Sequence, residues 1–158
     1  MPRFYLAQDG HVVNILPPIN ITGGVTAQTF HLKFHELANI IVQVGISAGA
    51  PSKILVNACS DAGGDNATAI PFDIYTQETA GENYDVLSGR TAVTAAGYTP
   101  SGNDDIFYVL EVLGANLPAG KPYVELEITN TAQSVIASAV AVLSGSRYAS
   151  DQSETVTT

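Results

Sequence analysis

Hydrophobic and polar residues alternate with a period of two over several stretches of this chain. The clearest case is segment 29–35, in which Phe30, Leu32 and Phe34 alternate with His31, Lys33 and His35. Successive side chains of a β-strand point to opposite sides of the sheet, so the pattern predicts a strand with one buried and one solvent-facing side. A helical period of 3.6 residues does not persist anywhere in the chain, which predicts a mostly β protein.

Other segments have either the alternation or the composition of a strand. Strands are predicted at residues 38–44, 53–59, 72–76, 106–113, 123–129 and 135–143, with less regular patterns at 11–16 and 91–98. Segment 38–44 is nearly all apolar, which is typical of a central strand covered on both faces. Turns rich in Gly and Pro separate the segments. About eight strands at this spacing predict an all-β domain, either a sandwich of the jelly-roll type or a barrel.

The two ends of the chain differ from the middle. Residues 1–28 are predicted to form an extended N-terminal arm, because Pro17 and Pro18 interrupt a sheet and Gly23-Gly24 marks a hinge. The apolar residues of this arm need a surface to bury on, either the domain itself or a neighbouring subunit. Residues 29–144 are assigned to the β-sandwich domain. Residues 145–158 are assigned to a polar C-terminal tail, extended or disordered.

Composition narrows the possible functions. The chain has 158 residues, enough for one domain with a hydrophobic core. Charged residues make up only 13%, well below the usual quarter, which favours a protein that is partly covered in an oligomer or assembly. The net charge of -9 disfavours binding to nucleic acid phosphates and to anionic membranes.

Cys59 is the only cysteine, so an intrachain disulfide is excluded, and its apolar surroundings predict a small core residue. The N-terminus lacks the apolar region of a secretory signal, and the apolar stretches are too short to span a bilayer. We therefore expect synthesis in a cytoplasm and no membrane partner.

The candidate metal sites are weak. On a strand, His31 and His35 share a face but lie about 13 Å apart, too far for one ion, and Lys33 between them would repel a cation. Loop 61–66 is rich in oxygen ligands, which calcium prefers, yet it lacks EF-hand spacing and has the composition of an ordinary turn. Calcium there is kept as the minor alternative.

Catalytic patterns are equally weak. Glu125 and Glu127 are predicted to share the outer face of one strand about 7 Å apart, which is near the carboxylate spacing of glycosidases. Two acids on such a face are more commonly just solvated. The Gly-x-Ser-x-Gly nucleophile motif is absent. We therefore expect a protein that is not an enzyme and needs no cofactor.

Three segments carry a resemblance to small proteins of tailed-phage head gene clusters. In these proteins a Phe-rich strand precedes a polyapolar strand that ends in Gly, as in segment 29–45 here. A later strand is similar to 123–126, and the closing stretch, a small-residue strand ending in Arg-Tyr, is similar to 143–148. The resemblance implies a capsid decoration, or cement, protein: a β-sandwich on the outside of a phage capsid, often a trimer at seams between capsomers.

A structural virion protein that bridges neighbouring capsomers is therefore the expected function, with the major capsid protein as partner and a homo-oligomer, preferably a trimer, as its state. It is expected on the capsid exterior. The contact residues expected for this function are hydrophobic anchors in the arm and a polar strand face: Phe4, Tyr5, Leu6, Val12, Val13 and Ile15, with His31, Lys33 and His35.

Two alternatives stay open. The first is a carbohydrate-binding or tail-fibre-type module that recognises a cell surface. The absence of Trp weakens it, but the 7 Tyr residues could supply stacking surfaces. The second is a small hydrolase on a jelly-roll scaffold, for which the sequence offers no assembled site.

Overall fold

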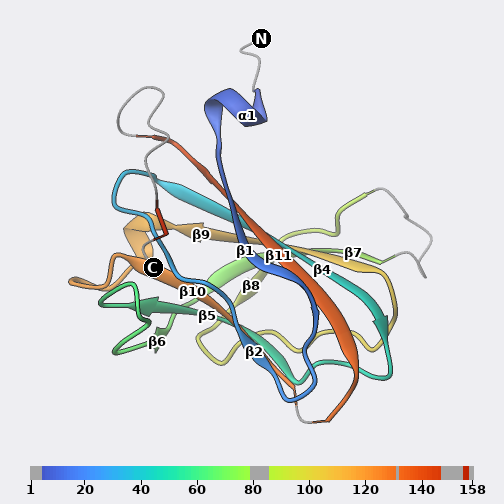
Figure 1. Ribbon diagram of the computed structural model, residues 1–158. Helices are drawn as coiled ribbons and strands as arrows, with labels where there is room; N and C mark the ends of the chain where they lie inside the picture. Colours follow the sequence, from blue (N-terminus) through green and yellow to red (C-terminus); the bar gives the residue numbers. More distant parts are fainter. Residues whose placement is uncertain (1–4, 79–85, 131, 147–154, 157–158) are drawn as a thin grey trace.

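The computed structural model describes residues 5–78, 86–130, 132–146 and 155–156, and nearly all of the regular structure in them is β. Two antiparallel sheets pack face to face, as Figure 1 shows, so the predicted all-β sandwich is confirmed. The elements in chain order are α1 (Leu6–Asp9), β1 (His11–Asn20), β2 (Val25–Thr26), β3 (Phe30–His31), β4 (Leu37–Ser47), β5 (Lys53–Cys59), β6 (Thr68–Ala69), β7 (Phe72–Glu78), β8 (Thr91–Val93), β9 (Ile106–Leu113), a 3-10 turn (Gly114–Asn116), β10 (Tyr123–Thr129) and β11 (Val135–Ser144).

The six-stranded sheet has the order β1-β11-β4-β9-β7-β8, and the five-stranded sheet has the order β2-β10-β5-β6, with β3 also paired to β10. The first strand of the chain therefore pairs with the last one. Strands β5, β9 and β10 begin and end at the predicted residues, because each is paired along its whole length.

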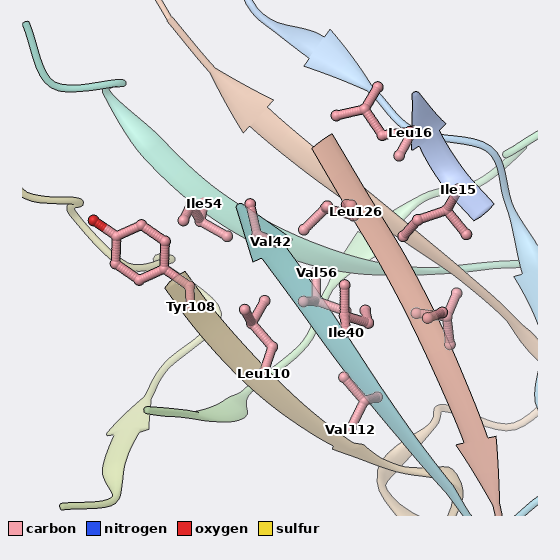
Figure 2. Close-up of a cluster of buried hydrophobic side chains, with 14 of the residues drawn as sticks. Ile15, Leu16, Ile40, Val42, Ile54, Val56, Tyr108, Leu110, Val112 and Leu126 are labelled. Carbon is pink, nitrogen blue, oxygen red and sulfur yellow. The ribbon is translucent and has the colours of Figure 1, made fainter. Parts of the chain in front are cut away.

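The hydrophobic core lies between the sheets. Every second residue of the long strands points inward, and the inward side chains of β4, β5, β9 and β10 are almost fully buried. Figure 2 shows this cluster, which includes Ile40, Val42, Ile54, Val56, Tyr108, Leu110, Val112 and Leu126. The phenolic oxygen of Tyr108 accepts a hydrogen bond from the Ser101 N–H at 3.1 Å, so its one polar atom is satisfied at the edge of the core.

The prediction of one long strand over residues 29–35 is wrong. Only Phe30 and His31 pair, with β10, and Leu32 then donates its N–H to the carbonyl of Pro122 at 2.9 Å. Pro122 has no N–H to return, so the ladder ends there. The chain then turns, with the His35 N–H bonded to the Leu32 carbonyl, and the His35 side chain is 2% exposed.

The prediction of a separate arm over residues 1–28 is also wrong for most of its length. Residues 11–20 form β1, and the register with β11 shifts on both sides of Leu16, next to Pro17 and Pro18. Strand β1 is at the edge of its sheet, where proline is tolerated because one side of the strand has no ladder to maintain. Four side chains of the expected arm are buried in the domain's own core: Val13, Ile15, Leu16 and Ile21.

The described part of the C-terminal tail returns to the domain. The Thr155 carbonyl accepts a hydrogen bond from the His31 N–H at 3.0 Å, and Val156 packs against the core. The Thr155 side chain is 1% exposed. The polar tail expected over residues 145–158 is therefore held against the domain at these two residues, while residues 147–154 and 157–158 lie outside the described part of the chain.

Replacing Ile15 with Ala tests whether β1 belongs to the core. Ile15 is 2% exposed, so we expect the free energy of unfolding to fall by about 2–5 kcal/mol. Val12 on the same strand is 49% exposed, and Val12→Ala should change that free energy by less than about 0.5 kcal/mol. Urea unfolding measures both, and equal effects of the two substitutions would contradict the assignment of β1.

Candidate functional site

Exposed apolar side chains gather at the N-terminal end of the described chain. Tyr5, Leu6 and Val12 are 50%, 49% and 49% exposed, and we refer to these three residues as the N-terminal patch. Figure 1 shows α1 beyond the end of β1, clear of both sheets. The single helical turn of α1 is closed by a hydrogen bond in which the Tyr5 N–H donates to the Asp9 carboxylate at 2.6 Å. The patch is therefore presented on a short, hydrogen-bonded projection of the sandwich.

Gly10 connects this projection to the sheet. A Cβ on Gly10 would lie 2.9 Å from the Leu6 carbonyl oxygen and 3.4 Å from Val142 on β11. Val142 is also the register partner of Val12. The patch therefore continues from α1 onto the edge of the six-stranded sheet, and the close approach requires a residue without a side chain at Gly10.

The structure separates the other predicted contact residues. Val13 and Ile15 point into the core and are not accessible to a partner. Phe4 lies outside the described residues. Lys33 is exposed, with its Nζ 5.2 Å from the centre of the Phe34 ring. Of the predicted contacts, the accessible ones are the N-terminal patch and Lys33, with His31 half-buried.

The predicted polar strand face of His31, Lys33 and His35 does not exist as one face. His35 turns inward and stacks on His11, the first residue of β1, with ring centres 5.7 Å apart. His31 lies edge-on to Tyr123 of β10 at 5.9 Å. The stack places the 32–36 turn beside the base of α1, so Lys33 lies at the same end of the sandwich as the N-terminal patch.

Metal ligation is not found in the described part of the chain, where no group of three or more His, Cys, Asp or Glu side chains is arranged to hold an ion. In the loop proposed as a minor calcium candidate, Oδ1 of Asp61 accepts hydrogen bonds from the N–H groups of Gly63 and Asp65 at 2.9 and 3.1 Å. This carboxylate therefore organises the turn itself, as Asp commonly does.

The paired acids on β10 lie on the outer face of the five-stranded sheet, as predicted, but Glu125 is buried instead of solvated. The Asn57 side chain lies between them and donates to Glu125 at 3.4 Å and to Glu127 at 3.0 Å. A Cβ on Gly64 would lie 2.5 Å from Oε2 of Glu125, so the 61–66 loop closes over this carboxylate.

The environment of Glu125 changes its acidity. Burial raises the pKa of Glu125, repulsion from Glu127 adds to the increase, and the hydrogen bond from Asn57 opposes it. Cys59 lies on the same side of the sheet, fully buried, outside the main hydrophobic core. Burial raises the pKa of the Cys59 thiol to about 11, so the thiol stays protonated and a weak nucleophile.

The outer face of the six-stranded sheet, called here the outer sheet face, is a feature that the sequence analysis missed. Register partners place Val140, Ile41, Val109 and Tyr75 in one continuous row across β11, β4, β9 and β7. All four side chains are half-buried, and the five-stranded sheet covers only the opposite side. The apolar run at 38–44 had predicted a strand covered on both faces, and its exposed half could have indicated a docking surface.

Polar groups on this face are already engaged with one another. Asp73 forms an ion pair with Arg90 at 3.1 Å, and the Tyr75 hydroxyl donates to Glu111 at 3.2 Å. Burial and the neighbouring Glu111 carboxylate raise the pKa of Tyr75, so the hydroxyl remains a donor. An open hollow of about 390 Å³ lies at this end of the face, lined among others by Leu37, Asp73, Arg90, Glu111, Leu113 and Asn116.

The chain is similar in fold to a phage-derived protein of known structure. No known protein family matches the chain, and no curated protein does. A solved structure, the SPBc2 prophage-derived protein YomS, is similar over 85% of this chain and 93% of that one, with 16% sequence identity and a TM-score of 0.43. Among the described residues no helix is both long and apolar enough to cross a membrane.

The acidity of Glu125 gives a pH prediction. Folding raises this pKa above its ordinary value of 4.5, so the stabilisation from the protonated carboxyl is complete below pH 4.5 and is lost as pH rises through the folded pKa. We expect the free energy of unfolding of the wild type to fall between pH 4.5 and 7 relative to that of Glu125→Gln. Urea unfolding across this range measures it, and parallel pH profiles would contradict the burial of an ionisable Glu125.

Proposed function

We propose that this protein is a structural virion protein of a tailed phage, which binds the outer surface of the capsid and stabilises the shell by bridging neighbouring capsomers. The resemblance of segments 29–45, 123–126 and 143–148 to small head proteins supports the proposal. The observation that carries it is the N-terminal patch, an apolar anchor that projects from one end of a compact β domain. Its partner would be the major capsid protein.

The composition of the patch suits a weak contact repeated many times. Burying an exposed large apolar side chain contributes about 1.5–3 kcal/mol, so Tyr5 and Leu6 can supply a modest affinity per copy. Many copies acting on one shell convert modest affinities into high avidity. Lys33, at the same end, adds a cation in a chain of net charge -9 and can fix the orientation of the contact.

The surroundings of the candidate catalytic groups support binding over catalysis. Glu125 lies under the 61–66 loop, its partner Glu127 shares the Asn57 amide, and the Cys59 thiol is buried and protonated. Glu125 and Cys59 are both buried, whereas a nucleophile or general base must be accessible to a substrate. A role built on surfaces therefore agrees better with the chemistry of the chain than a hydrolase does.

The double variant Tyr5→Ser/Leu6→Glu tests the anchor. We expect its retention on capsid shells, assembled from the major capsid protein of the phage that encodes this chain, to fall at least about tenfold, because both apolar contacts are lost. Co-sedimentation of purified protein with shells measures retention. The matched control is Ile46→Glu, which alters an apolar side chain that is 72% exposed at the far end of β4 and should bind like the wild type.

Deletion of residues 1–9 gives a second form of the same test and leaves β1 in place. A longer deletion through Asn20 would remove a core strand and could not separate binding from folding. Unchanged shell retention of both the double variant and the deletion would overturn the proposal. Binding of the wild type to a glycan array without binding to shells would also overturn it and favour the carbohydrate-recognition alternative.

A further inference from the structure

The outer sheet face has an apolar central row and flanking rows that mix polar and apolar side chains. Its central row is Val140, Ile41, Val109 and Tyr75. The next row toward one end carries Val12, Val142, Asn39, Glu111 and Asp73, and the next row toward the other end carries Ser138, Gln43 and Phe107. An apolar centre with few charges around it is the usual arrangement of a specific protein interface.

Charge is distributed so that a second copy of the face fits against the first. The chain has a net charge of -9, yet among the described residues of this face the acids are Asp73 and Glu111, both in one row. Asp73 is paired with Arg90, and Glu111 accepts the Tyr75 hydrogen bond. The row on the other side of the central row is uncharged at Ser138, Gln43 and Phe107. It would therefore not repel the acids of a second copy.

This charge distribution is compatible with a twofold axis that lies between the two copies, above the central row and perpendicular to the strands. It places each central residue over its own counterpart, as Ile41 over Ile41, and exchanges the two flanking rows. Glu111 of one copy then lies over Phe107 of the other, and Asn39 lies over Gln43. Acids of the two copies never face each other, so the surface is self-complementary in the sense that a symmetric dimer requires.

The size of the face is sufficient for such a pair. The five longer strands of this sheet lie about 4.8 Å apart, and a stretch of about seven residues on each presents roughly 600 Å² per copy. Two copies would bury roughly 1,200 Å², which reaches the lower bound of stable, specific interfaces. Two sheets that pack face to face in this way interdigitate their side chains at about 10 Å, as in a sandwich core.

From these observations we propose that two copies of this chain pair through the outer sheet face, with Val140, Ile41, Val109 and Tyr75 at the centre. The pairing is a dimer, whereas the resemblance to decoration proteins favours a trimer. Its central row is separate from the residues that the capsid test alters, because Leu6 lies on α1 and Tyr5 precedes it. Val12, the third residue of the N-terminal patch, lies on β1 in a flanking row of the outer sheet face, next to Val142. A dimer of this kind carries two N-terminal patches.

Light scattering and sedimentation equilibrium of the full chain, over a range of concentrations, test the pairing directly. We expect a mass of twice 16.5 kDa that dissociates on dilution. In Val140→Glu and in Val109→Glu, like charges meet across the axis, and we expect the dimer dissociation constant to rise at least about tenfold. Ile46→Glu is the matched control, since Ile46 lies off the central row, and it should dimerise like the wild type.

A conservative variant separates pairing from folding. Val140→Thr keeps the shape and β-propensity of the side chain, and we expect a smaller rise in the dissociation constant with unchanged urea unfolding of the monomer. A wild-type mass of one chain at every concentration, or of three chains, would overturn the pairing. So would a dimer that Val140→Glu and Val109→Glu leave intact while both remain folded. Shell binding by Tyr5→Ser/Leu6→Glu reports on the capsid proposal separately.

Discussion

The burial of one face of each sheet against the other is the interaction on which the rest of this structure depends. Inward residues of β4, β5, β9 and β10 form a continuous core that excludes water, and their outward neighbours are thereby fixed in position. The two sheets differ in how far their outer faces are covered. The five-stranded sheet covers part of its own with the 61–66 loop, which encloses Glu125, whereas the six-stranded sheet leaves an apolar row half exposed.

Local alternation was enough to place the strands whose partners run along their full length. Strands β5 and β10, predicted from alternation, and β9, predicted from its β-branched and aromatic composition, match the predicted bounds because each has a complete ladder. The pattern failed at segment 29–35 for a tertiary reason: the partner strand begins after Pro122, which cannot donate to the ladder. At Pro17 and Pro18 the sequence predicted an interrupted sheet, but the strand continues. An edge strand tolerates the missing N–H of proline, whereas a central strand does not.

The candidate surfaces were harder to predict than the strands. Tyr5, Leu6 and Val12 were identified from their apolar character, and the structure leaves them exposed, but Val13 and Ile15 in the same segment are buried. The difference depends on which side of β1 faces the opposite sheet, and the register shifts around Leu16 alter that side along the strand. Likewise, the burial of Glu125 depends on a loop that returns from β5, which no local pattern around Glu125 encodes.

The position of β11 between β1 and β4 has a consequence for how the chain acquires its structure during synthesis. The first strand has its sheet partner only in the last one, more than a hundred residues later. While a ribosome is still translating the chain, β1 has no ladder to join and its apolar side chains remain in solution. The six-stranded sheet can therefore close only after residue 144 has left the exit tunnel, which favours slow folding dominated by distant pairings.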